Sequence, residues 1–589
     1  MESDVLRKKS SGESHERIPV QTGGVQVNFC KNPVCKNFGI PAKESLSKGK
    51  KDAYGLDTTG RSLRPALVCS GCGEKFPVKS NLGIAEETGR LARELHERPE
   101  PSCPNEPCVN HAVPVKAGSS AYHSFGKTHS GSHRYKCKAC KRTFAVGTST
   151  VRQRHPHKNK TVFLLLMNKS PFRRICEVAR VNPKTLMRDK IEFIHQQCLA
   201  FGADRESALL DAMPIRRLYL STDRQDYVVN WTHREDRRNV VLHAVSTADN
   251  ATGYVFGTHL NYDATLDADA IEAEAEKIGD ASKKGPYKRY ARLWLKRDYM
   301  EALASRNGRK KVAGSLLRDV EASYAECAAR DDVEEFETQD TSRRLPAKGM
   351  QVHAEYTLYA HFMFLRKLFS GVEKTRFFLD QDSGMRAACL SAFWREIKAR
   401  RCDAFFVRIA KDKTVNEKRA LVAKRRDEFE LAKLGHPGLT DCELKTLLMK
   451  DRLGAAREIG RWRDRWIVHP LPDMSEPEKA VCYLTDYGDY DEDHLARLLC
   501  KASLHGTDRF LMQVRRRLSL LERPIATANN DRRLWHGYAA YNPAMVGKML
   551  GIFRVFYNYC LAGEDKKTPA QRLGLTKARV ELEDIIYFK

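Results

Sequence analysis

Eight cysteines in the first 140 residues form two copies of one pattern, and their spacing suits metal binding. In each copy a Cys-x4-Cys pair is followed by a Cys-x2-Cys pair. Two such pairs can surround one tetrahedral zinc ion, because each short loop brings two thiolates to the metal. The pattern predicts two tandem zinc ribbons with structural Zn²⁺ ligands at Cys30, Cys35, Cys69, Cys72, Cys103, Cys108, Cys137 and Cys140.

The residues between the cysteines also repeat, which indicates a duplication. Ala53-Tyr54 in the first copy is matched by Ala121-Tyr122 in the second, and Cys-x2-Cys-x3-Phe-x-Val occurs in both. Disulfide-stapled modules are the alternative. However, no apolar signal peptide precedes the cysteines and nine of the 17 cysteines lie further along the chain, which favours a reducing cytosol. Three histidines of the second copy could replace a cysteine, but the first copy has no counterparts, so we expect surface or phosphate-facing positions for His123, His129 and His133.

Three aspartates could hold metal ions of a different kind. Asp223 and Asp380 each close a run of β-branched and aromatic residues, and Asp508 opens a helical pattern that a proline ends. Hard ions such as Mg²⁺ or Mn²⁺ prefer carboxylates held on rigid elements. Two such ions, about 4 Å apart, can activate the attacking oxygen and stabilise the leaving oxygen in phosphoryl transfer. We therefore expect Asp223, Asp380 and Asp508 to form a catalytic site for two divalent ions.

Other carboxylates compete for these roles. Asp226 and Asp382 follow closely after the first two aspartates and could face the same way, although Asp380-Gln381-Asp382 is also what a plain turn looks like. Glu522 is the alternative third ligand. In one continuous helix it would lie about 21 Å from Asp508 along the axis, so only one of the two reaches the metals. Asp508 is preferred because the start of a helix favours an anion, whereas Glu522 lies among arginines at the unfavourable end.

The elements expected to hold these aspartates follow a definite order. The hydrophobic pattern predicts three strands, a helix, a strand, a helix and a strand, at residues 217–223, 239–245, 252–259, 350–370, 374–380, 383–400 and 403–409. Charged, helix-forming sequence from about 263 to 348 is interpreted as an insertion. This order is typical of an α/β ribonuclease-H-like domain, which we assign to residues 212–525, followed by a helical segment at 526–589.

Smaller units are expected before that domain. They are a disordered basic tail, the first zinc ribbon, a helical linker, the second zinc ribbon and a helix-turn-helix, at residues 1–28, 29–80, 81–100, 101–150 and 160–200. Asn182-Pro183 supplies an N-cap and a proline at the first helical position of the second helix of this motif. That helix would present Lys184, Thr185 and Arg188 to a DNA major groove, with an ordinary helical hairpin as the alternative.

The composition points to a polyanionic partner. The chain has 102 Lys and Arg against 75 Asp and Glu, a formal charge of +27. Nucleic acid is the first candidate, because neutralising phosphates releases counterions. A membrane surface is the competing polyanion, but no apolar run approaches about 18 residues. Arg515, Arg516 and Arg517 cover most sides of their expected helix, so at least one should face the sheet or a phosphate.

Several segments resemble DDE-type transposases of bacterial insertion sequences. The span Asp380-Gln381-Asp382-Ser383-Gly384-Met385-Arg386-Ala387-Ala388 resembles the second-aspartate segment of Mutator-like transposases. Asp508 with the arginines at 515–517 resembles their Glu-Arg helix, in which the catalytic acid stands seven residues before an arginine cluster. Here Asp replaces the usual Glu. Residues 568–575, Thr-Pro-Ala-Gln-Arg-Leu-Gly-Leu, resemble a C-terminal signature of these enzymes.

The resemblance implies hydrolytic nicking at the 3′ ends of a mobile element, followed by attack of the freed 3′ hydroxyl on target DNA. Asp223, Asp380 and Asp508 would hold two Mg²⁺ or Mn²⁺ ions. The ribbons and the helix-turn-helix would bind double-stranded terminal inverted repeats, and the protein would act as at least a dimer, in the bacterial cytoplasm on the nucleoid. A group of aromatic residues is expected either to stack on an unpaired base or, as is more common, to pack internally: Trp535, Tyr538 and Tyr541.

Two other functions stay open. A DNA-binding regulator with an inactive ribonuclease-H-like domain would bind specific DNA without cutting it. A nuclease without strand transfer would cut DNA without joining ends.

Overall fold

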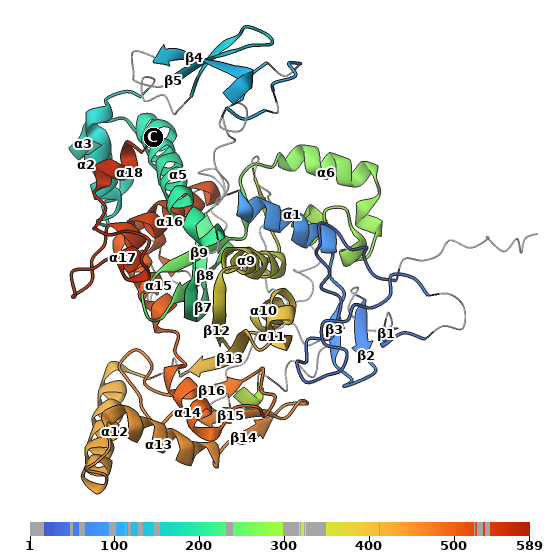
Figure 1. Ribbon diagram of the computed structural model, residues 1–589, viewed down its shortest axis with the longest axis vertical. Coiled ribbons are helices and arrows are strands. Elements are labelled where there is room, and N and C mark those ends of the chain that lie inside the picture. The colour runs from blue at the N-terminus through green and yellow to red at the C-terminus, as the bar shows by residue number, and fades with distance from the viewer. Residues whose placement is uncertain are drawn as a thin grey trace, which may run out of the picture.

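The computed structural model describes residues 17–46, 51–57, 65–93, 102–105, 107–111, 113–115, 119–127, 133–146, 153–211, 213–230, 239–298, 317–318, 320–322, 324, 349–410, 413–522, 525–526, 534–535 and 542–588. The chain is a multidomain α/β protein with a mixed eight-stranded sheet, helices on both faces of that sheet, and two small cysteine-containing modules (Figure 1). Among the described residues, no helix is both long and apolar enough to cross a membrane.

The central sheet has the strand order β14-β15-β16-β13-β12-β7-β8-β9. Five of its strands match the predicted ones: β7 (Ile215–Asn230), β8 (Asn239–Asp249), β9 (Val255–Leu260), β12 (Val372–Asp380) and β13 (Cys402–Ile409). The first three form an antiparallel meander, whereas β12 is parallel to both β7 and β13. Strand β7 does not end at Asp223 as expected, because buried Tyr227 and Val229 continue its alternating pattern.

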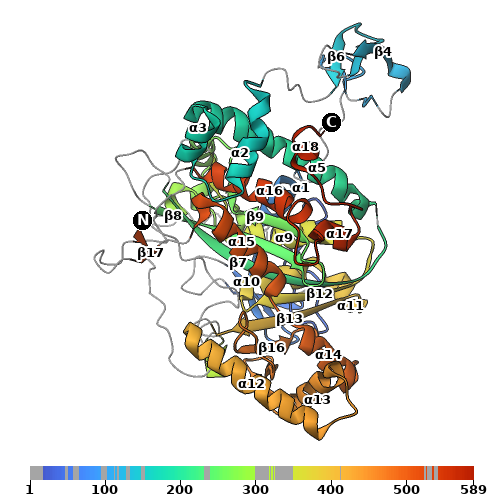
Figure 2. The same ribbon diagram turned by 90° about the vertical axis from the view of Figure 1, so that its left-hand side faces the viewer.

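Three further strands, which were not expected from the hydrophobic pattern, extend the sheet beyond β13. They are antiparallel strands: β16 (Lys479–Tyr483), β15 (Asp464–Val468) and β14 (Arg457–Ile459). Fully buried Trp466 of β15 stacks at 6.1 Å on Phe406 of β13, which ties the extension to the predicted sheet. The same segment contains helices that lie at one end of the molecule in Figures 1 and 2: α12 (Val415–Gly435), α13 (Asp441–Leu453) and α14 (Glu492–Lys501).

Helices cover both faces of the sheet. On one face lie α9 (Ala354–Leu368), α10 (Ser383–Ala392) and α11 (Trp394–Lys398), where Phe362 packs on Phe377 of β12 at 5.6 Å. The single helix expected at 383–400 is broken at Phe393. On the other face lie α15 (His505–Arg517) and α16 (Pro543–Tyr559), with a short turn η7 (Ser519–Leu521) after α15. These layers leave the inner strands buried on both sides.

The expected insertion is closed at its base by a short ladder between β10 (Tyr262–Asp263) and β11 (Met350–Gln351). Its described part holds α6 (Ala268–Lys277) and the 3₁₀ turns η5 (Asp280–Ser282) and η6 (Gly285–Tyr287). Most of the insertion beyond residue 298 lies outside the described residues.

The first module holds β1 (Tyr54–Asp57), β2 (Ala66–Cys69) and β3 (Lys75–Pro77), followed by the predicted linker helix α1 (Asn81–Ala92). The expected disordered tail is wrong for its described part, residues 17–28. There Ile18 and Val27 are buried, and Asn81 donates to the carbonyl of Pro19 at 2.8 Å. A few apolar residues in this polar stretch are enough to anchor it.

The second module holds η1 (Ser119–Ala121), β4 (Tyr122–Lys127), β5 (His133–Cys137) and β6 (Thr143–Val146). A helical segment follows, made of η3 (Pro156–Lys158), α2 (Asn159–Leu166), α3 (Phe172–Ala179), α4 (Pro183–Thr185), η4 (Leu186–Lys190) and α5 (Ile191–Leu210). Arg180 turns the chain after α3 with φ 50°, and the Asn182 side chain caps α4 as predicted. From Pro183 the helix continues through the π-helical η4 to Leu210, further than expected.

At the C-terminal end, residues 568–575 form a capped helical turn. Thr568 caps α17 (Pro569–Leu573), and Arg572 donates to the carbonyl of Thr252 in the turn between β8 and β9 at 3.0 Å. The remaining short elements are β17 (Ile525–Ala526), β18 (Leu534–Trp535) and α18 (Leu582–Ile586).

Candidate zinc centres and carboxylate site

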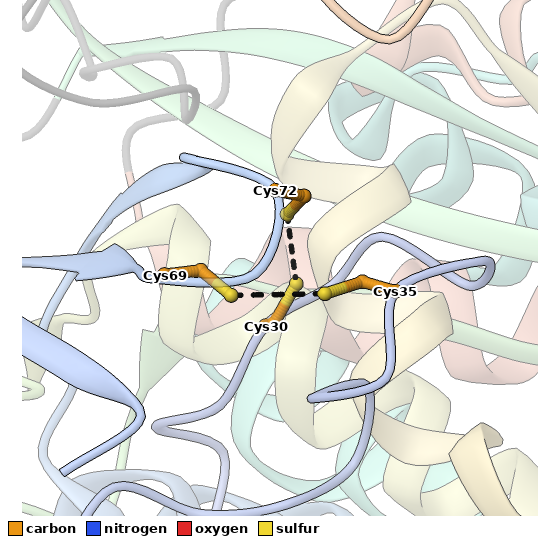
Figure 3. Close-up of side chains that lie close together, drawn as sticks. All are labelled: Cys30, Cys35, Cys69 and Cys72. Atoms are coloured by element: carbon orange, nitrogen blue, oxygen red, sulfur yellow. Dashed lines mark hydrogen bonds between the residues drawn. The ribbon is translucent and has the colours of Figure 1, made fainter.

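The eight predicted cysteines form two separate clusters. In the first, the Sγ atoms of Cys30 and Cys72 lie 3.5 Å apart and those of Cys35 and Cys69 lie 3.7 Å apart, and Figure 3 shows the four sulfurs gathered together. The second cluster repeats this arrangement with Sγ separations of 3.3 and 3.7 Å. Within each cluster all four ligand atoms lie within 4.8 Å of one another. This spacing is compatible with one tetrahedral zinc ion in each module.

A tyrosine hydroxyl organises the first cysteine loop in both modules. The N–H of Cys30 donates to Tyr54 Oη at 3.0 Å, and this hydroxyl also reaches carbonyls of the following loop at 2.6 and 2.9 Å. Tyr122 receives the N–H of Cys103 at the same distance. The Ala-Tyr repeat noted in the sequence therefore marks a second structural feature shared by the two modules.

The sulfurs have surroundings that suit a bound cation. The side-chain amide of Asn37 donates to Cys69 Sγ at 3.2 Å, and Asn110 donates to Cys137 Sγ at 3.3 Å. The hydrogen bond with Cys30 lowers the pKa of Cys72 to about 5, whereas the same hydrogen bond raises the pKa of Cys30 and burial raises the pKa of Cys35 to about 11. Sulfur ligands that receive N–H donors are typical of structural zinc sites. The residues present therefore fit the expected ion.

The described histidines of the second module lie outside its cysteine cluster. His123 and His133 are exposed on β4 and β5, and the cluster contains cysteines alone. His129 lies outside the described residues.

The first module packs tightly on the α/β body. The Trp394 ring lies 6.2 Å from that of Phe29, Lys79 forms an ion pair with Glu355, and α1 packs along α9. The sequence alone gave no indication of this docking.

Buried Glu74, which was not among the expected site residues, lies 3.0 Å from Cys30 Sγ of the first cluster. Its carboxylate accepts the N–H groups of Lys31 and Asn32 at 2.8 and 3.0 Å. Burial raises the pKa of Glu74, and the positive charge of Arg386 on α10 opposes this rise. The duplicated sequence did mark this position as different between the modules, because Glu74 of the first copy is replaced by Arg142 in the second. Glu74 thus couples the first cluster electrostatically to the helix that follows β12.

Asp223 and Asp380 occupy corresponding positions on neighbouring parallel strands. Leu379 of β12 pairs with Thr222 of β7, and the two aspartates are the next residues along each strand. Side chains alternate between the faces of a sheet, so Asp223 shares the face of Ser221, which α15 covers. Asp380, at the corresponding position, points to this face too, and Asp223 is 8% exposed there.

Asp508 approaches the same face from α15. The N–H of Thr507 donates to Ser221 Oγ at 2.9 Å, which fixes the start of α15 beside β7. Successive residues turn by about 100°, so Asp508 lies on the flank of α15 opposite Phe510. The Phe510 ring packs against Phe553 of α16 at 5.7 Å, and α16 lies over β9. The flank with Asp508 is therefore directed away from α16. Among the described residues, the groups of three or more potential metal ligands that lie within 4.8 Å of one another are the two cysteine clusters, and the three aspartates do not form such a group.

The carboxylates that compete with Asp223 and Asp380 have other partners. Asp226 lies on the opposite face of β7 and approaches His243 Nδ1 of β8 at 2.7 Å. Asp382 caps α10 and accepts the N–H of Gly384 at 2.7 Å.

Glu522 lies outside α15, because the helix predicted to run on to Pro524 ends at Arg517. Its carboxylate forms a 2.7 Å ion pair with Lys169, in the turn between α2 and α3. Leu518, in an extended conformation, and η7 separate it from the helix, so the axial spacing expected from one continuous helix does not apply.

The three consecutive arginines have different surroundings. Arg516 is exposed, and the guanidinium of Arg517 lies 3.4 Å from the carbonyl of Met167 after α2. Arg515 is half-buried. Burial raises the pKa of Tyr227, and the charge of Arg515 opposes this rise, so Arg515 lies near the face of β7 that α15 covers.

The residues predicted to contact DNA lie at the start of the long helix. Lys184 and Arg188 are exposed, whereas Thr185 is half-buried and its N–H donates to Asn182 Oδ1 at 2.7 Å. The side chains of the three aromatic residues expected near the C-terminal segment lie outside the described residues: Trp535, Tyr538 and Tyr541.

Comparison of the chain with protein-family models, with curated proteins and with solved structures finds no match.

Proposed function

We propose that the protein is a DNA transposase of the DDE type, which cleaves at the ends of a mobile element and joins the freed 3′ hydroxyl to target DNA. The observation that supports this proposal is the register of β7 and β12, in which Asp223 and Asp380 follow paired residues of neighbouring parallel strands, while Asp508 lies in the first turn of α15, which packs on β7. Two-metal phosphoryl transfer needs carboxylates on rigid elements.

The strand order supports the same proposal. Strands β9, β8, β7, β12 and β13 are neighbours in this order, with β7, β12 and β13 parallel and the other two antiparallel to their neighbours. We infer a ribonuclease-H-like core, in which the first and fourth strands carry the paired carboxylates. The strands β14, β15 and β16 would then be an addition at its edge.

In the proposed reaction the chain supplies position and charge. Asp223, Asp380 and Asp508 would hold two Mg²⁺ or Mn²⁺ ions, which supply Lewis-acid activation of the attacking and leaving oxygens when bound. Asp223 is buried, and its carboxylate accepts the N–H of Arg224 at 2.6 Å, which restrains its orientation. Arg515, near the same face of β7, is suited to bind a DNA phosphate.

Binding of the element ends is assigned to the N-terminal units. The exposed Lys184 and Arg188 at the start of a helix suit a helix-turn-helix contact with double-stranded DNA. The net charge of +27 supports a polyanionic partner. Joining two ends requires at least a dimer on DNA, and we infer a cytoplasmic protein that acts on the bacterial nucleoid.

The test uses purified full-length protein and labelled duplexes made from the sequences that flank its gene, incubated with Mg²⁺ or Mn²⁺. We expect metal-dependent nicking and joining that is lost in Asp380→Asn and retained in Asp226→Asn, the matched carboxylate on the opposite face of β7. Nicking without joining would indicate a nuclease instead. Specific binding without any nicking by the unaltered protein would contradict the proposal and favour a DNA-binding regulator.

A further inference from the structure

One face of the second module carries an exposed aromatic ring close to two cations. Phe125 of β4 is 47% exposed. The guanidinium of Arg134 lies 5.3 Å from the centre of this ring, and Lys136 Nζ lies 5.8 Å from it. Both cations come from alternate positions of β5, so they share one face of the small sheet.

The backbone presents Phe125 outward. The register between β4 and β5 shifts at this point, and Gly126 takes a left-handed conformation with φ 75°. Such a bulge re-aims a side chain. The interior of the module is filled without Phe125, because Tyr122 packs edge-on against Phe144 at 5.5 Å. The exposed ring is therefore not needed for the core.

The duplication supplies an internal comparison for this face. When the modules are aligned on their shared tyrosine and cysteines, the positions of Phe125, Arg134, Lys136, Lys141 and Arg142 are occupied in the first module by Asp57, Ala66, Val68, Gly73 and Glu74. The two modules share their metal ligands, so metal binding does not explain the difference. The first module instead packs on the α/β body. At these positions, only the second module carries the basic and aromatic residues.

We propose that this face of the second module binds single-stranded DNA, with Phe125 stacked on an unpaired base and Arg134 and Lys136 against the flanking phosphates. A ring framed by cations suits this partner, because every base offers a face for stacking while the backbone is attracted to positive charge. The inference rests on the proposed function, because cleavage at an element end would expose the unpaired strand that this face binds. It assigns end-strand capture to the second module and a structural role to the first.

The experiment measures binding of full-length protein to fluorescent oligo(dT) and to a duplex of the same length, without added Mg²⁺ so that cleavage is not required. We expect Phe125→Ala to weaken oligo(dT) binding roughly 10-fold or more and to leave duplex binding unchanged. Lys136→Ala should make oligo(dT) binding less dependent on salt. Lys36→Ala, an exposed cation of the first module, is the matched control and should bind as the unaltered protein does.

Zinc content of each variant confirms that the modules remain folded. Unchanged oligo(dT) binding by Phe125→Ala, or an equal loss on the duplex, would overturn the inference. The two proposals fail separately. Cleavage of end DNA together with normal oligo(dT) binding by Phe125→Ala would sink only this inference. Phe125-dependent binding by a protein that never cleaves would sink only the transposase proposal.

Discussion

Ser221 of β7 and Thr507 of α15 are joined by three buried contacts. Ser221 Oγ accepts the N–H of Thr507 at 2.9 Å, and the two hydroxyl oxygens are 2.9 Å apart. Thr507 Oγ1 also donates to the Ser221 carbonyl at 2.7 Å. These bonds hold the first turn of α15 against β7 two residues before Asp223, and Asp508 is the next residue of that turn.

Replacing Thr507 with valine keeps the shape of the side chain and removes its hydroxyl. We expect Thr507→Val to lower the free energy of unfolding by about 1–3 kcal/mol, because a buried hydrogen-bonding group loses its partner. We also expect slower DNA cleavage with unchanged DNA affinity. The control is Thr357→Val, which removes a buried hydroxyl of α9 that donates to Glu87 at 3.1 Å, on the opposite face of the sheet from α15. Equal loss of cleavage in the two variants would show that Thr507 acts through stability alone.

The third carboxylate can be identified by comparing two conservative changes. Asp508→Asn is expected to reduce metal-dependent cleavage by about a hundredfold or more, since several kcal/mol of transition-state stabilisation is involved. Glu522→Gln should retain cleavage, because Glu522 pairs with Lys169 at an exposed site beyond α15. The measurement is the initial rate of nicking at saturating Mg²⁺. The opposite ranking would reassign the third ligand to Glu522.

Local spacing predicted the cysteine clusters well. Each cluster is built from two short loops, so the residues that meet in space are also close in sequence, and the duplication reinforced the pattern. The strand and helix order from 215 to 409 was also predictable, since each strand has its own run of β-branched and aromatic residues. The N-cap at Asn182 followed from its side chain and the adjacent proline.

Features that depend on distant partners were not predictable. Strands β14 to β16 are short. Trp466 of β15 stacks on Phe406 of β13, and this contact joins residues that are far apart in the sequence. Docking of the first module depends on Trp394, far along the chain. The extent of α15 was overestimated, because its arginine-rich sequence favours helix while Leu518 adopts an extended conformation at its end. The register that brings Asp380 beside Asp223 likewise comes from pairing of strands far apart in sequence.

Glu74 and Arg142 occupy equivalent positions in the two modules, and their replacement should have very different effects. Glu74→Ala leaves the N–H groups of Lys31 and Asn32 without their acceptor and removes a buried carboxyl group that interacts with Arg386. We expect a loss of about 3–5 kcal/mol in the free energy of unfolding. Arg142→Ala changes an exposed residue and should stay within about 0.5 kcal/mol. Thermal unfolding of the zinc-loaded proteins measures both. Similar shifts in the two variants would contradict a structural role for the first module.

The salt dependence of DNA affinity tests whether the first turns of the long helix from Pro183 contact DNA. We expect Arg188→Ala to weaken binding to end duplexes and, if it removes one phosphate contact, to lower the slope of log affinity against log salt by about 0.9. A contact to a base edge would instead cost about 1–3 kcal/mol with sequence dependence. The matched control is Arg205→Ala, an exposed arginine about 25 Å further along the same helix, which should bind normally. Equal weakening by both variants would mean that the helix contributes general positive charge, and the helix-turn-helix interpretation would fail.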